Sequence, residues 1–543
     1  MNIFQKKPLD TLISESKEEG EQTLKKSLGS YQLIALGLGA IIGAGLFSIT
    51  GLAAGNNAGP AITLSFLIAA AGCGFAALCY AEFASMIPVA GSAYTYSYAT
   101  LGEFIAWVIG WDLVLEFAVA SATVSISWSR YFVKLFEGFN IYLPTELTAC
   151  PWDGGWINLP AAFIVVLMSL LLIRGTESSS IINSFIVILK VAVVIIFIVL
   201  GWKYIRPENY VPYIPENTGE WGKFGFSGIL RAAAIVFFAF LGFDAVSTAA
   251  QETKNPKKNM PIGILGSLII CTILYILFAY VLTGVANYTA FQGRDGIAPV
   301  AIAIDQMGEV LPDGSIQPAF PWLNKAIILA ILAGYSSVIL VMLLGQSRIF
   351  YSMSHDGLLP KIFSDIHPKF RSTYKSNLLF LLLVSVFAMF VPAHIAGELT
   401  SIGTLLAFII VSIGIIVMRK KQPDAPRAFK TPGVPVIPII GICFCLFMMV
   451  SLPFDTWIRL ILWMLFGHDI YAFYGSRKSK LGAKKGVRLL SVIGLGIASF
   501  LLTLTVVHQW QKGWENMALF SYFLLFIALF HIVLYGIRFI RKK

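Results

Sequence analysis

The sequence predicts an all-α polytopic membrane protein with about 14 transmembrane helices. Of its 543 residues, 57% are hydrophobic and only 13% are charged, about half the charged share of a typical soluble domain. The mean hydropathy is +0.78. The apolar residues form continuous runs of about 20, the length that a helix needs to cross a bilayer. Membrane-spanning strands would instead alternate over about ten residues.

Fourteen segments meet the length criterion for a spanning helix. In chain order they are 31–53, 60–86, 103–134, 157–174, 180–202, 227–250, 262–286, 323–350, 376–392, 397–418, 434–452, 456–474, 487–508 and 516–537. Only Pro453, Phe454 and Asp455 separate 434–452 from 456–474.

The basic residues predict the orientation of these spans. With the amino terminus inside, 29 Lys and Arg residues fall in inner segments and 8 in outer loops, as the positive-inside rule requires. Both termini are therefore expected in the cytoplasm and the protein in the cell membrane. The net charge of +11 then reflects topology and lipid contact, which excludes a nucleic-acid partner. Segment 1–29 has no apolar centre, so we expect a solvated cytoplasmic tail and not a cleavable signal peptide.

Two of the spans are interrupted. The first has Gly43 and Gly45 around Ala44 near its middle, and each glycine costs about 1 kcal/mol relative to alanine. The sixth carries Gly242 and Asp244 deep in an apolar run. Interrupted helices five spans apart indicate a transporter built from two inverted repeats, although small residues in the first span also suit close helix packing. Half-helix ends offer N–H groups to an anion and carbonyls to a cation, and a zwitterion has both charges.

Several segments carry a family resemblance. In order, the chain contains IIGAGLF, AGPAITLSF, CYAEFASMIPVAGSAYTYSY, GWDLVLEF, FGFSGILRAAAIVFFAFLGFDAVSTAAQETKNPKKNMPIGI, GQSRIFYSMSHDGLLP, SIGTLLAF and RAFKTPGVP. This ordered set resembles amino acid permeases of the amino acid–polyamine–organocation superfamily, in the branch of the cationic amino acid transporters and their bacterial relatives. The resemblance implies a five-plus-five inverted-repeat (LeuT-like) core over 30–433, with repeats at 30–204 and 225–420. Four accessory helices and a short cytoplasmic tail would occupy 434–543.

The resemblance also implies a substrate site beside the two breaks. Backbone N–H groups would hold the substrate carboxylate at Gly43, Ala44 and Gly45. Backbone carbonyls would hold its α-ammonium group at Phe238, Ala239 and Leu241. Many relatives have a hydroxyl residue between the two glycines, so with Ala44 the carboxylate would depend on the backbone alone.

Four polar residues within the spans are candidates for proton coupling. Lys190 lies about eleven residues, roughly 16 Å, from either end of the fifth span, where an uncompensated lysine is costly. In bacterial relatives a lysine at the matching position contacts the unwound first helix, where sodium-coupled relatives bind sodium, which implies proton coupling. A permanent structural contact to helix-end carbonyls is the alternative. Glu116, Asp244 and Tyr275 match positions near the substrate site, where they would recognise a cationic side chain, exchange a proton or cross-link helices.

The expected function is therefore secondary active transport of L-amino acids, with proton-coupled uptake by alternating access. A sodium-coupled or exchange-type carrier of amino acids or polyamines is an alternative within the same fold, and a non-transporting amino-acid sensor is another. An enzyme is excluded, because the sequence has no HExxH motif, no paired histidines and no plausibly placed GxSxG. We expect no metal and no cofactor. The expected partners are an L-amino acid, the proton and the lipid bilayer; a small membrane subunit and the preference for cationic or neutral substrates stay open.

Overall fold

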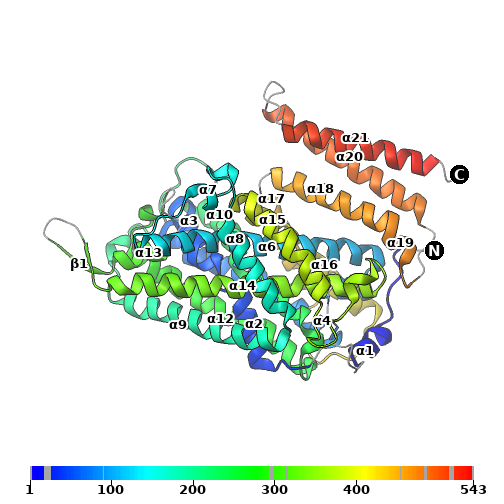
Figure 1. Cartoon of the computed structure of the whole chain (residues 1–543), viewed down its shortest axis with the longest axis horizontal. Helices are drawn as coiled ribbons and strands as arrows, with labels where there is room; N and C mark the ends of the chain where they lie inside the picture. The colour runs from blue at the N-terminus through cyan, green and yellow to red at the C-terminus, as the bar shows by residue number, and fades with distance from the viewer. Residues whose placement is uncertain are drawn as a thin grey trace.

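Helices make up nearly all of the regular structure (Figure 1). The computed structural model describes residues 3–17, 26–89, 91–292, 299–311, 316–452, 454–481, 486–512 and 519–540. The amino-terminal half contains α1 (Leu9–Lys17), α2 (Ser30–Ile41), η1 (Gly45–Ile49), α3 (Thr50–Ala53), η2 (Ala54–Ala58), η3 (Gly59–Ala61), α4 (Ile62–Met86), α5 (Ala93–Thr100), α6 (Glu103–Glu137), α7 (Thr145–Thr148), η4 (Pro151–Asp153), α8 (Leu159–Ile173), α9 (Thr176–Trp202) and η5 (Pro207–Tyr210). Here α denotes an α-helix and η a 3₁₀- or π-helical turn.

The rest of the chain continues this pattern. It contains α10 (Gly225–Val236), η6 (Phe237–Phe240), α11 (Ala245–Thr248), η7 (Ala250–Glu252), α12 (Pro256–Val285), η8 (Tyr288–Phe291), α13 (Pro299–Asp305), α14 (Pro321–His355), η10 (Lys361–Ser364), α15 (Tyr374–Phe390), α16 (Ala393–Lys421), α17 (Val436–Val450), α18 (Phe454–Ile470), η11 (Tyr471–Gly475), α19 (Ser476–Lys478), α20 (Val487–Lys512) and α21 (Leu519–Ile540). The short strands β1 (Gly308–Val310) and β2 (Ile316–Pro318) pair antiparallel, with Glu309 opposite Gln317.

The helices confirm a polytopic membrane protein. Each of the 14 predicted segments overlaps helical residues. Within the described ranges, nine helical stretches are long and apolar enough to cross a membrane, and one of them, Ser30–Met86, joins the first two predicted segments. The helices α8 and α15 have 15 and 17 residues, so they are shorter than a hydrocarbon core of about 30 Å at 1.5 Å per residue. The number 14 and the inverted repeat stay predictions.

The long helices lie side by side along the horizontal axis of Figure 1. At the centre, α6 packs against α14 and α16, and α12 packs against α2 and α4. The hairpin of β1 and β2 projects at the left end, whereas α1 and the carboxyl end of α21 lie toward the right end. The accessory helices α20 and α21 pack on each other and reach α18. In turn, α18 is fastened to α6 because the indole N–H groups of Trp111 and Trp463 donate to each other's backbone carbonyls.

The first part of the amino-terminal segment is packed against the bundle and not solvated throughout as predicted, whereas residues 18–25 of the predicted tail lie outside the described ranges. Ile3 and Leu12 are each only 1% exposed, and Lys7 is buried with its Nζ 2.6 Å from the carboxylate of Asp356. The backbone N–H of Lys7 also donates to the carbonyl of Tyr98. Local composition did not reveal this because the partners are about 90 and 350 positions away. The first part of the segment is therefore anchored to the bundle.

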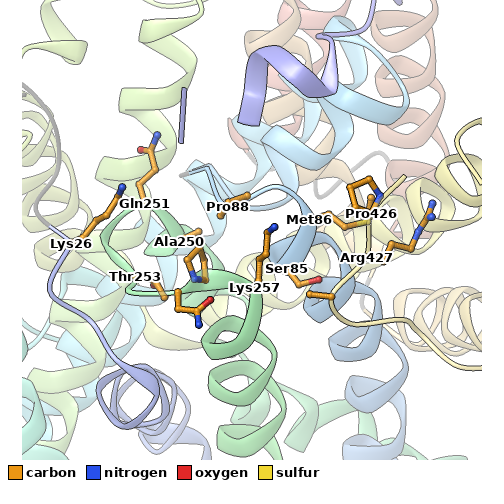
Figure 2. Close-up of a pocket in the computed structure, with 13 residues that line it drawn as sticks. Lys26, Ser85, Met86, Pro88, Ala250, Gln251, Thr253, Lys257, Pro426 and Arg427 are labelled. Carbon is orange, nitrogen blue, oxygen red and sulfur yellow. The ribbon is translucent and has the colours of Figure 1, made fainter. Parts of the chain in front are cut away.

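A buried ion cluster closes the same end of the bundle. Glu82, near the end of α4, accepts from Arg419 at 2.8 and 2.9 Å and from Arg427 at 3.1 Å. The backbone N–H of Thr431 donates to the same carboxylate at 2.7 Å. These contacts tie α4 to the end of α16 and to the loop that follows it. Arg427 also borders a cavity at this end, which Figure 2 shows in close-up.

Candidate functional site

The first predicted break is present in the structure. The helix α2 ends at Ile41, Ile42 has an extended backbone (φ −75°, ψ 102°), and helical geometry resumes at η1. The carbonyl of Gly43 accepts from the N–H groups of Leu46 and Phe47, each at 3.1 Å. The first N–H groups of a helix have no acceptor within it. The resumed helix therefore begins with N–H groups that no carbonyl of the same helix accepts.

The second break lies between α10 and α11. After the 3₁₀ turn η6, Leu241 has an extended backbone (ψ 139°), and Gly242 has a φ of +110°, a conformation that favours glycine. A Cβ atom at Gly242 would lie 2.7 Å from the Cβ of Ala40 and 2.8 Å from the Cε of Met342. Glycine is therefore needed there for both its backbone conformation and its small size.

The two breaks pack directly against each other. A Cβ atom on Gly45 would lie only 2.3 Å from the Cα of Ala239, so the two backbones approach closely because residue 45 is glycine. The hydroxyl of Tyr275 on α12 lies 2.7 Å from the carbonyl oxygen of Ile41 and 3.0 Å from that of Ala239. One side chain thus bridges carbonyls from both interrupted helices.

Lys190 contacts the unwound end of α2. Its side chain is fully buried, and its Nζ donates to the carbonyls of Gly39 at 2.7 Å and Ile42 at 2.9 Å. The hydroxyl of Ser337 on α14 lies 3.5 Å from the same nitrogen and donates to Asn183 at 2.6 Å. Sequence reasoning missed Asn183. A signal was available, because an asparagine seven residues before Lys190 lies on the same face of the helix.

The predicted acidic residues form a second group. Glu116 on α6 and Asp244 beside the second break are both buried and close enough to interact electrostatically. Both carboxylate oxygens of Asp244 and one of Glu116 have no hydrogen-bond partner among the described residues. The same holds for both oxygens of Asp112, one turn before Glu116. Burying such groups in their ionised form without partners is costly.

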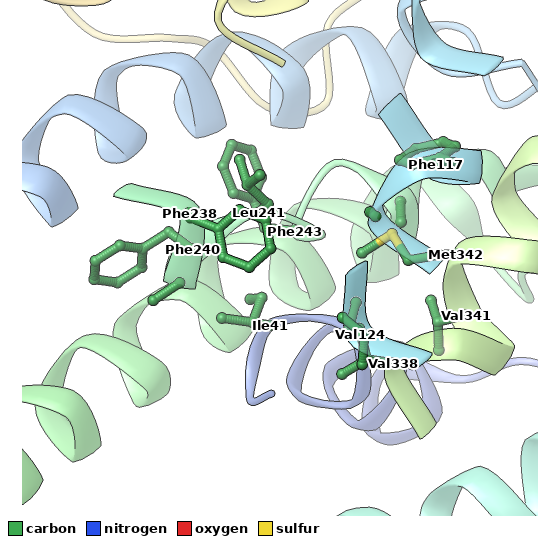
Figure 3. Close-up of a cluster of buried hydrophobic side chains, with 14 of the residues drawn as sticks. Ile41, Phe117, Val124, Phe238, Phe240, Leu241, Phe243, Val338, Val341 and Met342 are labelled. Atoms are coloured by element: carbon green, nitrogen blue, oxygen red, sulfur yellow. The ribbon is translucent and has the colours of Figure 1, made fainter. Parts of the chain in front are cut away.

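Apolar side chains surround the two breaks. Figure 3 shows them converging from the end of α2, from α6, from the second break and from α14; they include Ile41, Val124, Phe238, Leu241, Phe243, Val338 and Met342. All of these are buried. The charged groups described above therefore border a region that is mostly hydrocarbon.

Comparison with known proteins places the chain in a family. Residues 28–467 match the family model described as amino acid permease, and the chain belongs to this family, within the amino acid–polyamine–organocation superfamily. It is thus a multi-pass membrane transporter and not an enzyme. The match ends before α20 and α21.

Curated relatives agree over most of the chain. The chain is 45% identical to the branched-chain amino acid permease BcaP of Bacillus subtilis (strain 168), over 88% of this chain and 99% of that protein. It is 42% identical to the methylthioribose transporter of the same organism, with the same coverage. The vacuolar cationic amino acid transporter 4 of Arabidopsis thaliana is 34% identical, over 78% of this chain and 68% of that protein.

Proposed function

We propose that this protein takes up L-amino acids with small or branched apolar side chains, coupled to protons, by alternating access. The observation that carries the proposal is the pair of helix breaks packed against each other. One break presents backbone N–H groups, and the other presents carbonyls. A zwitterionic amino acid has the two charges that such ends bind.

In this proposal the backbone holds the constant part of the substrate. The N–H groups of Gly43, Ala44 and Gly45 bind the carboxylate. The carbonyls of Phe238, Ala239 and Leu241 bind the α-ammonium group. The carbonyl of Ala239 already accepts from Tyr275, and a carbonyl oxygen has a second lone pair for the substrate.

Proton coupling rests on Lys190. A protonated lysine has three donors, which match the carbonyls of Gly39 and Ile42 and the hydroxyl of Ser337. Loss of the proton weakens these contacts and loosens the first break, which links protonation to the geometry of the carboxylate site. The ammonium group also takes the carbonyls that a sodium ion would need. Glu116 and Asp244 supply a second place for protons, because they are buried with oxygens that lack partners.

The apolar surroundings of the breaks support a neutral substrate. Side chains from four elements around the site are hydrocarbon (Figure 3), and burying a guanidinium group among them is costly without a paired anion. One relative, the Bacillus subtilis protein that is 45% identical, is a branched-chain amino acid permease, which agrees with this choice. Glu116 or Asp244 pairing with the side chain of arginine is the competing possibility.

We propose further that the chain crosses the cell membrane 14 times, with an inverted repeat over 30–420 and both termini in the cytoplasm. The predicted segments and the distribution of basic loops support this topology. Fusing a reporter after residue 543 tests the orientation. We expect it to react with an impermeant reagent only after the membrane is permeabilised, and reaction in intact cells would contradict the proposal.

The decisive experiment is uptake into proteoliposomes. Labelled leucine, alanine and arginine are offered under an imposed pH gradient or an imposed sodium gradient, with methylthioribose as a competitor. We expect leucine to accumulate against its gradient only with the pH gradient, and Lys190→Met to abolish that accumulation. Lys203→Met, at the exposed end of α9, is the matched control. Accumulation driven by sodium, or retained by Lys190→Met, would reject proton coupling through this lysine; no accumulation at all would favour a sensor.

A further inference from the structure

A cavity of about 570 Å³ lies at the end of the bundle that is predicted to face the cytoplasm. The end of α4, the segment after α11, the first residues of α12 and the loop after α16 form its walls. Pockets that hold small molecules commonly measure about 300–1,000 Å³. None of the residues at the helix breaks described above lines this cavity.

The described residues that line this cavity carry positive charge. Its charged lining residues are Lys26, Lys257 and Arg427, and no acidic residue of the described chain lines it. Figure 2 shows the side chains of Lys26 and Lys257 extending beside the central space. Arg427 is held by Glu82 at 3.1 Å, and Glu82 is shared with Arg419. Two arginines share one carboxylate, so this cluster keeps a net positive charge. Arg419 does not line the cavity, and the Nη atoms of Arg427 donate to the backbone carbonyls of the loop after α16.

The remaining lining is neutral and partly apolar. Met86 is the last residue of α4, and Pro88 follows it in the chain. Pro426 lies in the loop after α16, and Ser85 and Gln251 add neutral polar groups. A cavity that combines cations with apolar walls suits an anion attached to a less polar body. Phosphate esters have this chemistry, because lysine and arginine bind their oxygens strongly. Basic pockets between helices at the cytoplasmic surface are suited to anionic lipid head groups.

We propose that this cavity binds a phosphate-bearing anion, supplied either by the head group of an anionic phospholipid or by a free phosphate. The ligand contacts α12 on one side and the loop after α16 on the other. The Glu82 cluster already joins that loop to α4, so the ligand adds a link between α12 and these two elements. This role is independent of which substrate the transporter carries.

The test is binding to the full-length protein in neutral detergent. The midpoint of thermal unfolding is measured against rising short-chain phosphatidylglycerol, with short-chain phosphatidylcholine as the neutral lipid. Inorganic phosphate is titrated separately against chloride at equal ionic strength. Lys257→Gln removes a lining cation. Lys258→Gln, the exposed neighbour that does not line the cavity, is the matched control with the same change in net charge.

We expect phosphatidylglycerol or phosphate to raise the midpoint of the wild type. In Lys257→Gln, the probe concentration that gives half of the maximal rise in the midpoint should increase about fivefold. This factor corresponds to the binding free energy that one lysine contributes near an anionic surface. Lys258→Gln should behave like the wild type. A response to phosphatidylglycerol alone assigns the lipid head group, and a response to phosphate assigns the free anion. The proposal is overturned if neither probe exceeds its neutral control, or if both variants respond alike.

Discussion

Replacing Gly43 with alanine adds one methyl group at the break in the first helix, and the structure defines what that group meets. The new Cβ would lie 2.7 Å from the Cγ2 of Val338, whereas carbon atoms in contact are normally about 3.5–4.0 Å apart. The two segments must separate by roughly 1 Å, and overpacking of this kind costs about 1–3 kcal/mol. If the cost falls on the substrate-binding geometry, the affinity for leucine drops about 5- to 150-fold.

A second substitution makes this prediction specific. The next atom of Val338 that the new methyl group meets is its Cβ at 3.7 Å, an ordinary contact, so Val338→Ala removes the clash. Because alanine keeps the backbone N–H of residue 43, the double variant should recover most of the affinity. The assay is the KM for leucine in proteoliposomes, with the unfolding midpoint of each variant and Val338→Ala alone as the control. An unchanged KM in Gly43→Ala, or a double variant no better than it, would refute the reasoning.

Three further substitutions test the polar contacts. Lys190→Met removes the lysine that donates to the carbonyls of Gly39 and Ile42, and the loss of this donor costs about 1–3 kcal/mol for each carbonyl. We therefore expect loss of uptake driven by the pH gradient, and the proposal fails if leucine still accumulates. Tyr275→Phe removes the hydroxyl between the two breaks, so the KM for leucine should rise about 5- to 10-fold at an unchanged expression level, and an unchanged KM would show that the bridge is dispensable. Glu82→Gln removes the buried carboxylate charge that Arg419 and Arg427 share, so the free energy of unfolding should fall by about 3–5 kcal/mol; an unfolding midpoint equal to that of the wild type would contradict this.

Much of the helix pattern was predictable from the sequence. Each of the apolar runs of spanning length overlaps helical residues, because hydrocarbon excludes unsatisfied backbone groups. The two breaks were predictable for a related reason. Gly45 and Gly242 stand in apolar runs where a helix former would be expected, and each proves to lie where another backbone or side chain approaches within less than 3 Å of the missing Cβ.

The partners of the polar residues were harder to predict. Lys190 was recognised as costly, but Asn183 and Ser337 complete its network through contacts about 150 positions apart. The sequence predicts a solvated tail around Lys7 because its partner, Asp356, lies far away in the chain. Contacts of this kind depend on how the helices pack, and neither the composition nor the local spacing of residues predicts that packing.

The hydroxyl of Tyr275 has a consequence for how the two interrupted helices communicate. It lies within hydrogen-bond distance of two carbonyl oxygens, those of Ile41 and Ala239, yet a tyrosine hydroxyl carries a single hydrogen. At any instant only one carbonyl receives the full bond, and the other is short of a donor. If the ammonium group of a substrate binds Ala239 as proposed, it supplies that missing donor and leaves the hydroxyl to Ile41. Substrate binding at the second break then changes the hydrogen bonding at the first break through the rotation of one O–H bond, with no movement of the backbone.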